Sequence, residues 1–309
     1  VNAFNPKTVV MTGSHGFIGT HLTRALTEQG YQVVPLGPPH CALADATAVS
    51  KFFADTRPEI VFHLAGLSSP GRDRNSMEAP YASNTAPAIN LARCLPEWPP
   101  LALFFGSCEE YGNGPAPFRE TQEPVCFSPY GWGKIAGHQG AMMIARQRNL
   151  NLCWLRPFLT YGPGQDTKQL IPALIRGCLR DEDIPLTSGE QTRDFVYVHD
   201  LCAMILRVLR EPHKLKHQTL NIATGTPRSV RFVAQTIQRV IGRGNLKFGS
   251  LPYRMEEAMS FYASIEKYRK LFGEPSFTPF EEAIQATIQA QYAPTPKRGE
   301  TSIILNSSC

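Results

Sequence analysis

Two residues with complementary proton chemistry stand one helical turn apart in this chain. Tyr130 and Lys134 lie just inside the expected start of a helix, so their side chains should share one face. A phenol titrates near pH ~10, but a neighbouring ammonium favours the phenolate and lowers that pKa. The pair could therefore pass a proton to or from a hydroxyl or carbonyl oxygen. Alone the spacing is a weak signal, because a Tyr and a Lys so placed also form solvated helix faces.

A glycine-rich turn near the N-terminus supplies the context. Residues 7–12 form a short apolar run typical of a buried strand, and a helical pattern follows the turn. Strand, glycine turn and helix together set a pyrophosphate on the N–H groups of a helix N-terminus. Gly13 permits the tight turn, Gly16 lets the backbone approach the phosphates, and Gly19 lets helix and strand pack closely. The alternative is a glycine-rich turn without a ligand.

The composition limits the class of protein. The chain has 309 residues, 42% of them apolar, and its net charge of +5 is spread without a basic block, so we do not expect nucleic-acid binding. It has no run of 18 or more apolar residues that predicts a membrane span, and no signal-peptide pattern. The eight cysteines show neither Cys-x-x-Cys nor metal-like spacing with histidine. We therefore predict no metal site, and reduced thiols in a cytoplasmic protein.

The order of the elements predicts the fold class. Strands are expected at 31–36, 60–65, 101–106 and 151–156, with helices at 46–56, 75–95 and 129–149 between them. This alternation predicts an α/β fold with a doubly wound parallel sheet, whose ligands lie at the carboxyl ends of the strands. Later segments are less regular, with helices at 169–179, 200–209 and 229–241 and a strand at 219–222.

Several motifs occur together in one order, and with them the chain resembles the extended short-chain dehydrogenase/reductase family. The blocks are residues 12–19, 63–66, 106–112, the pair Tyr130 and Lys134, residues 156–165 and residues 191–201. The resemblance runs from about residue 7 to about residue 289 and implies a Rossmann-like fold. It implies a dinucleotide-binding domain over 1–165 and an interleaved substrate-binding domain over 166–293. Residues 294–309 are rich in Ser, Thr, Pro and Lys/Arg, which predicts a flexible tail.

The resemblance also implies a nicotinamide cofactor. An acid after the second strand would favour NAD and an Arg would favour NADP, but residues 36–40 read Leu-Gly-Pro-Pro-His, which tilts the expectation slightly towards NADP, with His40 as a phosphate contact. Asp45 matches the family position that holds the adenine amino group, or it is a plain helix N-cap. His63 is expected to pack rather than to react. The residues assigned to the cofactor are Gly13, His15, Gly16, Phe17, Ile18, Gly19, Ala44, Asp45, Leu64, Ala65, Gly66, Asn84, Tyr130, Lys134 and Pro157.

The catalytic roles that the resemblance implies involve the segment after the fourth strand. Ser107 would orient the reacting oxygen, Tyr130 would act as acid or base, and Lys134 would perturb Tyr130 and bind the ribose. A dehydratase needs a base at C5 and an acid for the departing C6 hydroxyl. Glu109 could be that base, whereas Cys108 is a poor substitute for a carboxylic acid. The alternative for Glu109 and its neighbour Glu110 is a polar loop.

On the substrate side, the resemblance implies a nucleotide-diphosphate sugar. Arg193, Arg254 and Gln165 are the expected contacts, because a guanidinium forks well onto phosphate. Either Arg could instead be a structural salt-bridge partner. Many relatives have Asn where this chain has Leu159, so the details of diphosphate binding are expected to differ.

These features favour reduction of a 4-keto-6-deoxy nucleotide-sugar by hydride transfer at C4. A 4,6-dehydratase and a 4-epimerase share the same catalytic groups and stay open. A non-catalytic dinucleotide-binding regulatory protein is the alternative of another class, although such proteins typically lose the Tyr or the Lys. The resemblance also implies a homodimer through the helix that bears Tyr130. Met142, Met143 and Ile144 could contribute to that interface or belong to the core.

Overall fold

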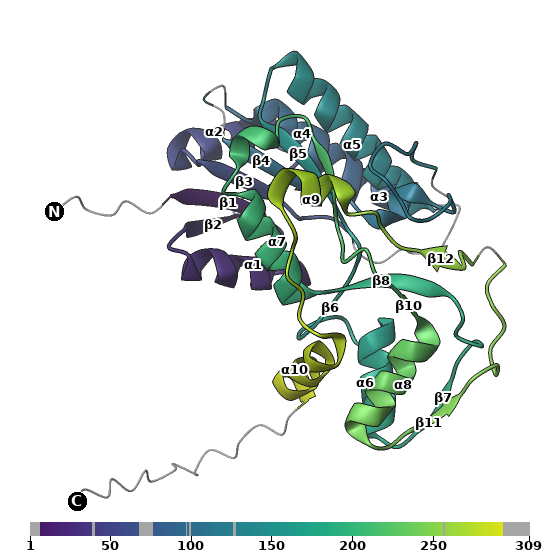
Figure 1. Ribbon diagram of the computed structural model, residues 1–309. Coiled ribbons are helices and arrows are strands. Elements are labelled where there is room, and N and C mark those ends of the chain that lie inside the picture. Colours follow the sequence, from purple (N-terminus) through teal and green to yellow (C-terminus); the bar gives the residue numbers. More distant parts are fainter. Residues whose placement is uncertain are drawn as a thin grey trace, which may run out of the picture.

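The computed structural model describes residues 7–38, 41–67, 77–96, 98, 100–125, 128–255 and 257–292 (Figure 1). His40 and the expected tail over 294–309 lie outside these described residues. Among the helices of the described part, none is both long and apolar enough to cross a membrane. The cysteines described are free thiols, namely Cys41, Cys94, Cys108, Cys153, Cys178 and Cys202.

A six-stranded parallel sheet forms the centre of the larger part of the molecule, which confirms the predicted fold class. Its order is β2-β1-β3-β4-β5-β9. The strands are apolar on both faces, as expected when helices cover a parallel sheet on both sides. Their bounds are β1 Thr8–Thr12, β2 Gln32–Leu36, β3 Ile60–His63, β4 Leu101–Phe105, β5 Leu152–Pro157 and β9 Thr219–Ile222.

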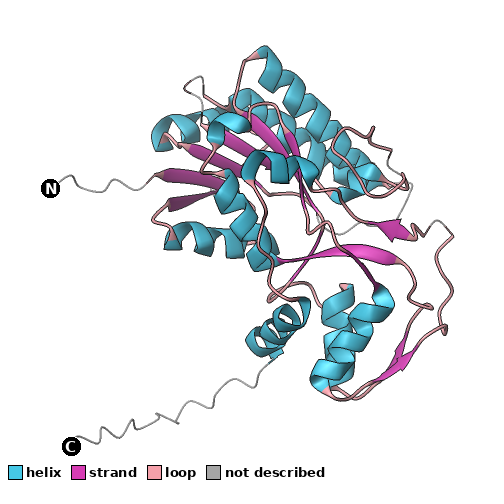
Figure 2. Cartoon of the chain, viewed as in Figure 1, coloured by secondary structure: helices cyan, strands magenta, loops and turns pink. Residues whose placement is uncertain are grey.

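Helices cover both faces of this sheet, as Figure 2 shows. Alternate strand residues enter different cores: Val9 and Met11 pack into one cluster and Val10 into the other. The first cluster is completed by α1 Phe17–Glu28, α7 Val198–Val208 and α9 Glu266–Phe272. The second is completed by α2 Ala46–Thr56, α4 Ala86–Cys94 and α5 Pro129–Gln147. Met142 and Ile144 of α5 are buried in that core, whereas Met143 is exposed.

A smaller part packs beside the carboxyl ends of the strands. It contains a four-stranded sheet in which β8 pairs with three short strands, and a separate pair of strands. Three helices enclose its own apolar core. The elements are β6 Leu159–Tyr161, β7 Asp183–Pro185, β8 Thr192–Tyr197, β10 Pro227–Ser229, β11 Asn245–Lys247, β12 Ser260–Phe261, α6 Leu170–Leu179, α8 Val230–Ile241 and α10 Phe280–Tyr292.

Short helical turns connect the larger elements. They are α3 Glu78–Pro80, the π-helical turn η1 Tyr81–Thr85, the 3-10 turn η2 Cys108–Tyr111 and η3 Pro212–Lys214. The predicted helix over 75–95 is thus broken by a π turn.

Two carboxylates join segments far apart in the sequence. Asp194 of β8 accepts hydrogen bonds from Thr224, Gly225 and Ala263, and Asp200 of α7 accepts two from Thr278.

Candidate functional site

The glycine turn between β1 and α1 is closed too tightly for side chains. Gly13 has φ +71°, and a Cβ there would lie 2.7 Å from the backbone N of Ala65. A Cβ on Gly19 would overlap the carbonyl oxygen of Gly13. Gly16 precedes α1 without any side-chain cap, so the first N–H groups of the helix remain available to a ligand. The turn therefore has the shape and the donors that a pyrophosphate requires.

The segment after β3 forms the next wall of this site. Thr12 and His63 share a hydrogen bond of 2.7 Å between Oγ1 and Nδ1, and the backbone N–H of Ala65 donates to Thr12 Oγ1 at 3.2 Å. Burial, with a smaller effect from Lys134, lowers the pKa of His63 to about 3. His63 is therefore a neutral, packed side chain, as the sequence predicts.

Three of the predicted residues converge beyond this wall. A Cβ on Gly66 would overlap the side-chain oxygen of Asn84 and would lie 3.3 Å from Lys134 Nζ. Asn84 is 2% exposed, yet neither its Nδ2 nor its Oδ1 has a hydrogen-bond partner among the residues that the structure describes. Because buried polar groups are normally paired, this amide fits a site completed by a polar ligand. A dinucleotide with its ribose and amide groups satisfies that requirement.

The proton-transfer residues lie at the carboxyl end of β4. Ser107 follows β4, and Tyr130 stands in the first turn of α5, which Ser128 caps by accepting the N–H of Gly131 at 3.0 Å. Lys134 Nζ donates to the carbonyl oxygen of Phe105 at 3.0 Å and lies 6.0 Å from the centroid of the Tyr130 ring. The structure thus brings Ser107, Tyr130 and Lys134 together, as the sequence predicts.

Their electrostatics differ from expectation. Burial raises the pKa of Tyr130 above its ordinary value, although a hydrogen bond with Ser107 opposes the increase. The net lowering expected from Lys134 is therefore wrong, because the burial of Tyr130 itself dominates its pKa. Burial also lowers the pKa of Lys134 to about 8 despite the attraction of Glu110, and its ammonium donates to a backbone carbonyl.

Cys108 and Glu109 differ in environment. Cys108 is buried, and that burial, together with the charge of Glu109, raises the pKa of its thiol well above the usual range. A thiol that holds its proton so firmly is a poor general acid. Glu109 is exposed, and Ser128 Oγ donates to its Oε2 at 3.5 Å. Of these two side chains, only that of Glu109 is exposed.

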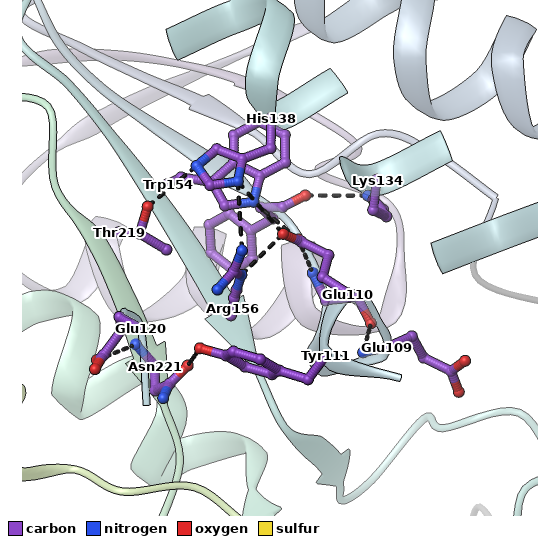
Figure 3. A network of polar contacts seen from close by, with 12 residues as sticks. Glu109, Glu110, Tyr111, Glu120, Lys134, His138, Trp154, Arg156, Thr219 and Asn221 are labelled. Atoms are coloured by element: carbon purple, nitrogen blue, oxygen red, sulfur yellow. Dashed lines mark hydrogen bonds and ion pairs between the residues drawn. The ribbon is translucent and has the colours of Figure 1, made fainter. Parts of the chain in front are cut away.

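The polar-loop alternative is wrong for Glu110. This residue is fully buried rather than part of a polar loop. Its Oε1 accepts the backbone N–H of Ser107 and the indole N–H of Trp154, each at 2.9 Å, and its Oε2 accepts Arg156 Nε at 2.8 Å (Figure 3). The Ser-x-x-Glu spacing from Ser107 to Glu110 is a capping-box signature that could have revealed this role.

Further contacts extend this network across the sheet (Figure 3). His138 of α5 stacks on Trp154 with centroids 4.7 Å apart and lies 3.1 Å from Thr219 Oγ1 of β9. The guanidinium of Arg156 lies over the Tyr111 ring, 4.5 Å from its centroid. Burial disfavours the charge of Glu110, but Arg156 and the hydrogen bonds of His138 and Trp154 outweigh it and hold its pKa at about 2. Glu110 is therefore ionised and committed to structure.

The expected substrate contacts lie at the border of the two parts. Arg193 forms an ion pair with Glu257 and donates to the carbonyl oxygens of Thr192 and Ala258 at 2.8 and 2.7 Å. Arg254 is exposed. Gln165 donates to the carbonyl oxygen of Thr160, and its buried Oε1 has no partner. The structural alternative for Arg193 is therefore realised here, and its role towards a substrate stays a prediction.

The remaining predicted cofactor residues lie partly within the glycine segment and partly on other elements. His15 is exposed and close to Ser14, and Phe17 begins α1. Asp45 caps α2 by accepting the N–H groups of Thr47 and Ala48, each at 3.0 Å, so its N-cap role is present. The residues not yet placed are Ile18 in α1, Ala44 before Asp45, Leu64 after β3 and Pro157 at the end of β5.

Comparison with known proteins adds to this geometry. The profile of the NAD dependent epimerase/dehydratase family matches residues 9–223. The CDP-abequose synthase of Salmonella muenchen is 22% identical, with 88% of this chain and 94% of that protein aligned. The GDP-6-deoxy-D-talose 4-dehydrogenase of Aggregatibacter actinomycetemcomitans is 26% identical, with 74% and 78% aligned. The structure of MoeE5 in complex with UDP-glucuronic acid and NAD has a TM-score of 0.80 and 26% identity, covering 92% of this chain and 98% of that chain.

The Glu110 network leads to a stability prediction. Glu110→Gln leaves Arg156 as an uncompensated buried charge, so we expect a loss of about 3–5 kcal/mol in the free energy of unfolding at pH 7. The ion pair stabilises the fold above about pH 4.5, and this contribution is lost as the pH falls towards 2, so the difference from wild type should narrow at pH 3. Urea denaturation measures both values. Glu109→Gln, an exposed neighbour, is the control, and an equal loss in both variants would contradict the assignment.

For Lys134 we predict that a substitution stabilises the folded protein instead of destabilising it. Its lowered pKa means that the ammonium destabilises the folded protein without a cofactor, so Lys134→Met should raise the free energy of unfolding at pH 7 by about 1–2 kcal/mol after loss of one hydrogen bond. Between pH 8 and 10.5 the folded wild type sheds this proton while the unfolded chain keeps it, so wild-type stability rises and the difference shrinks. Denaturation at pH 7 and 9.5 tests the sign, and a less stable variant at pH 7 would refute it.

Proposed function

The chain belongs to the NAD dependent epimerase/dehydratase family, and on that premise we propose that it reduces the 4-keto group of a nucleotide-diphosphate 6-deoxy sugar. The observation that carries the proposal is the convergence of Ser107, Tyr130 and Lys134 with the unpaired amide of Asn84 beside Gly66. Support for the substrate class comes from the relatives, one of which is named a 4-dehydrogenase of a GDP-linked 6-deoxy sugar.

The glycine turn would hold the cofactor pyrophosphate through backbone N–H groups, with the bases and riboses running from Asp45 to Lys134. A bound nicotinamide supplies the hydride, which the protein itself cannot provide. The family is NAD-dependent, whereas the end of β2 lacks the acid that selects NAD. We therefore propose NADH or NADPH as the cofactor, with NADPH slightly preferred.

The proton step follows from the state of Tyr130. When hydride adds to C4, the carbonyl π bond breaks and negative charge develops on the C4 oxygen. The Ser107 hydroxyl donates a hydrogen bond to that oxygen and Tyr130 transfers its proton to it, which leaves an alcohol and a tyrosinate. Lys134 then stabilises the tyrosinate. Burial favours the protonated form of Tyr130, which is the form that this reduction requires.

A 4,6-dehydratase is the weaker alternative for a specific reason. Elimination of water requires a second acid for the C6 hydroxyl. Cys108 has a raised thiol pKa, and Glu110 is ionised and engaged with Arg156, so neither supplies that proton readily. Glu109 alone would be a base without its acid. A 4-epimerase uses the same groups as the reductase, and its distinguishing result is a product of unchanged mass.

The quaternary structure and the diphosphate contact are part of the same proposal. Exposed apolar side chains on α5 and the neighbouring π turn, Trp132, Met143 and Tyr81, would meet their copies in a homodimer. Arg193 and Arg254 would bind the diphosphate, for which Arg193 must share or exchange its ion pair with Glu257.

The deciding experiment is incubation of the protein with NADPH or NADH and a panel of 4-keto-6-deoxy nucleotide sugars, followed by chromatography and mass spectrometry. A gain of two hydrogens in one sugar is the expected result. Incubation of the parent sugars with NAD or NADP tests the alternatives: loss of water identifies a dehydratase, and an isomer of unchanged mass identifies an epimerase. Absence of every conversion, with cofactor bound, favours a non-catalytic protein.

Tyr130→Phe separates catalysis from binding. The variant lacks the transferable proton, so turnover should fall about 10²–10⁴-fold, whereas the Kd for NADPH, measured by nicotinamide fluorescence, should stay within about threefold of wild type. Unchanged turnover would refute the proton route through Tyr130.

Arg193→Met tests the diphosphate contact. Loss of a forked guanidinium should raise the KM for the nucleotide sugar at least about tenfold and leave the Kd for NADPH unchanged. The matched control is Glu257→Gln, which breaks the same ion pair but keeps the guanidinium and should leave KM unchanged or lower. An equal rise in KM for both variants would mean that Arg193 acts only through the ion pair.

A further inference from the structure

The backbone of α5 approaches the π turn η1 unusually closely. Two glycines of α5, Gly133 and Gly137, face the segment from Pro80 to Thr85, and Gly140 faces Ile89 of α4. A Cβ on Gly137 would lie 2.7 Å from the backbone oxygen of Asn84, and one on Gly133 would lie 3.0 Å from that of Pro80, the residue before the turn. Because the nearest obstacle at Gly137 is backbone, a side chain there would displace the turn itself.

The π turn that packs against α5 contains a buried polar side chain without a hydrogen-bond partner among the described residues. Asn84 is the fourth residue of the five-residue π turn Tyr81–Thr85. Its backbone oxygen faces Gly137, while its amide reaches Gly66 and the neighbourhood of Lys134. Both amide atoms are buried without a partner, which is an arrangement that a protein tolerates when a ligand completes it. Single π turns inside helices are frequent at functional sites.

A second contact, a side-chain hydrogen bond, also joins this turn to α5. The hydroxyl of Thr85, 2% exposed, donates to the backbone oxygen of Gly133 at 2.9 Å. The π turn is therefore held between a hydrogen bond to Gly133 and a direct backbone contact at Gly137. Lys134 lies between these two glycines on α5, so the same helical turn sets the position of Lys134 and that of Asn84.

We propose that Gly137 is a positioning residue for the cofactor, acting through Asn84. Its missing side chain lets α5 seat the π turn so that the unpaired Asn84 amide meets the cofactor beside Lys134. This inference rests on the proposed dinucleotide binding and adds to it a residue that contacts neither cofactor nor substrate. It also gives a reason for the π turn, because a regular α-helix would rotate residue 84 by a different angle about the axis.

The test is a double-mutant cycle on the Kd for NADPH and NADH, measured by nicotinamide fluorescence on the full chain. Gly137→Ala should raise Kd about tenfold, as should Asn84→Ala, and the double variant should bind no more weakly than Asn84→Ala alone. The matched control is Gly140→Ala on the same helix. There a Cβ would meet Cγ1 and Cδ1 of the Ile89 side chain rather than the backbone of the π turn, so Asn84 should keep its place and Kd should stay within about twofold of wild type.

The outcomes are distinct. A wild-type Kd for Gly137→Ala, or losses that multiply in the double variant, would overturn the inference while leaving the proposed function intact. Failure of wild type to bind either cofactor would overturn both. If Gly137→Ala does not fold, Thr85→Val loosens the same turn without adding volume. Thr85→Val should weaken cofactor binding when introduced into the wild type but not when introduced into Asn84→Ala. Additive losses of binding free energy in that double variant would equally refute an effect through Asn84.

Discussion

The buried ion pair between Glu110 and Arg156 is the interaction on which the arrangement of the site depends. Each partner alone would be a costly charge inside the protein, so the two segments that carry them must stay together. Glu110 uses its other oxygen to hold the N–H of Ser107, which sets the turn after β4. Arg156 belongs to β5. The position of the orienting hydroxyl is thereby tied to the centre of the sheet rather than to a surface loop.

The groups around Lys134 are placed by close backbone contacts instead of by charge. Glycines remove the side chains that would separate the turn before α1 from the segment after β3, and α5 from the π turn, and Gly66, Asn84 and Lys134 lie close together beside these contacts. The result carries local costs, namely an unpaired amide and an ammonium with a lowered pKa. Both are concentrated where a polar ligand would relieve them, a pattern expected of functional sites.

The sequence predicted the parts of this structure that have strong periodicity or strong local rules. Helix α2 and strand β9 begin and end where expected, and the parallel sheet follows from the βα alternation. The strands of two or three residues were missed because so short a segment shows no period. The burial of Glu110 was not predicted because its partner Arg156 is 46 residues away in the chain. A salt bridge of Arg193 was an alternative without a named partner, because Glu257 lies in a separate segment of the smaller part.

The last strand of the large sheet has a consequence for how the molecule can be divided. Strand β9 and helix α7 follow the first strands of the smaller part in the chain, yet β9 pairs with β5 and α7 packs against α1. A fragment that ends near residue 165 would lack β9 and α7. Strand β5 would then be an unpaired sheet edge, and the face of α1 that packs against α7 would be exposed, two features that favour aggregation. The two parts are thus not modules that can be expressed separately or exchanged between relatives by a single crossover. A chimera with a relative that preserves the fold needs at least two junctions between the two sequences.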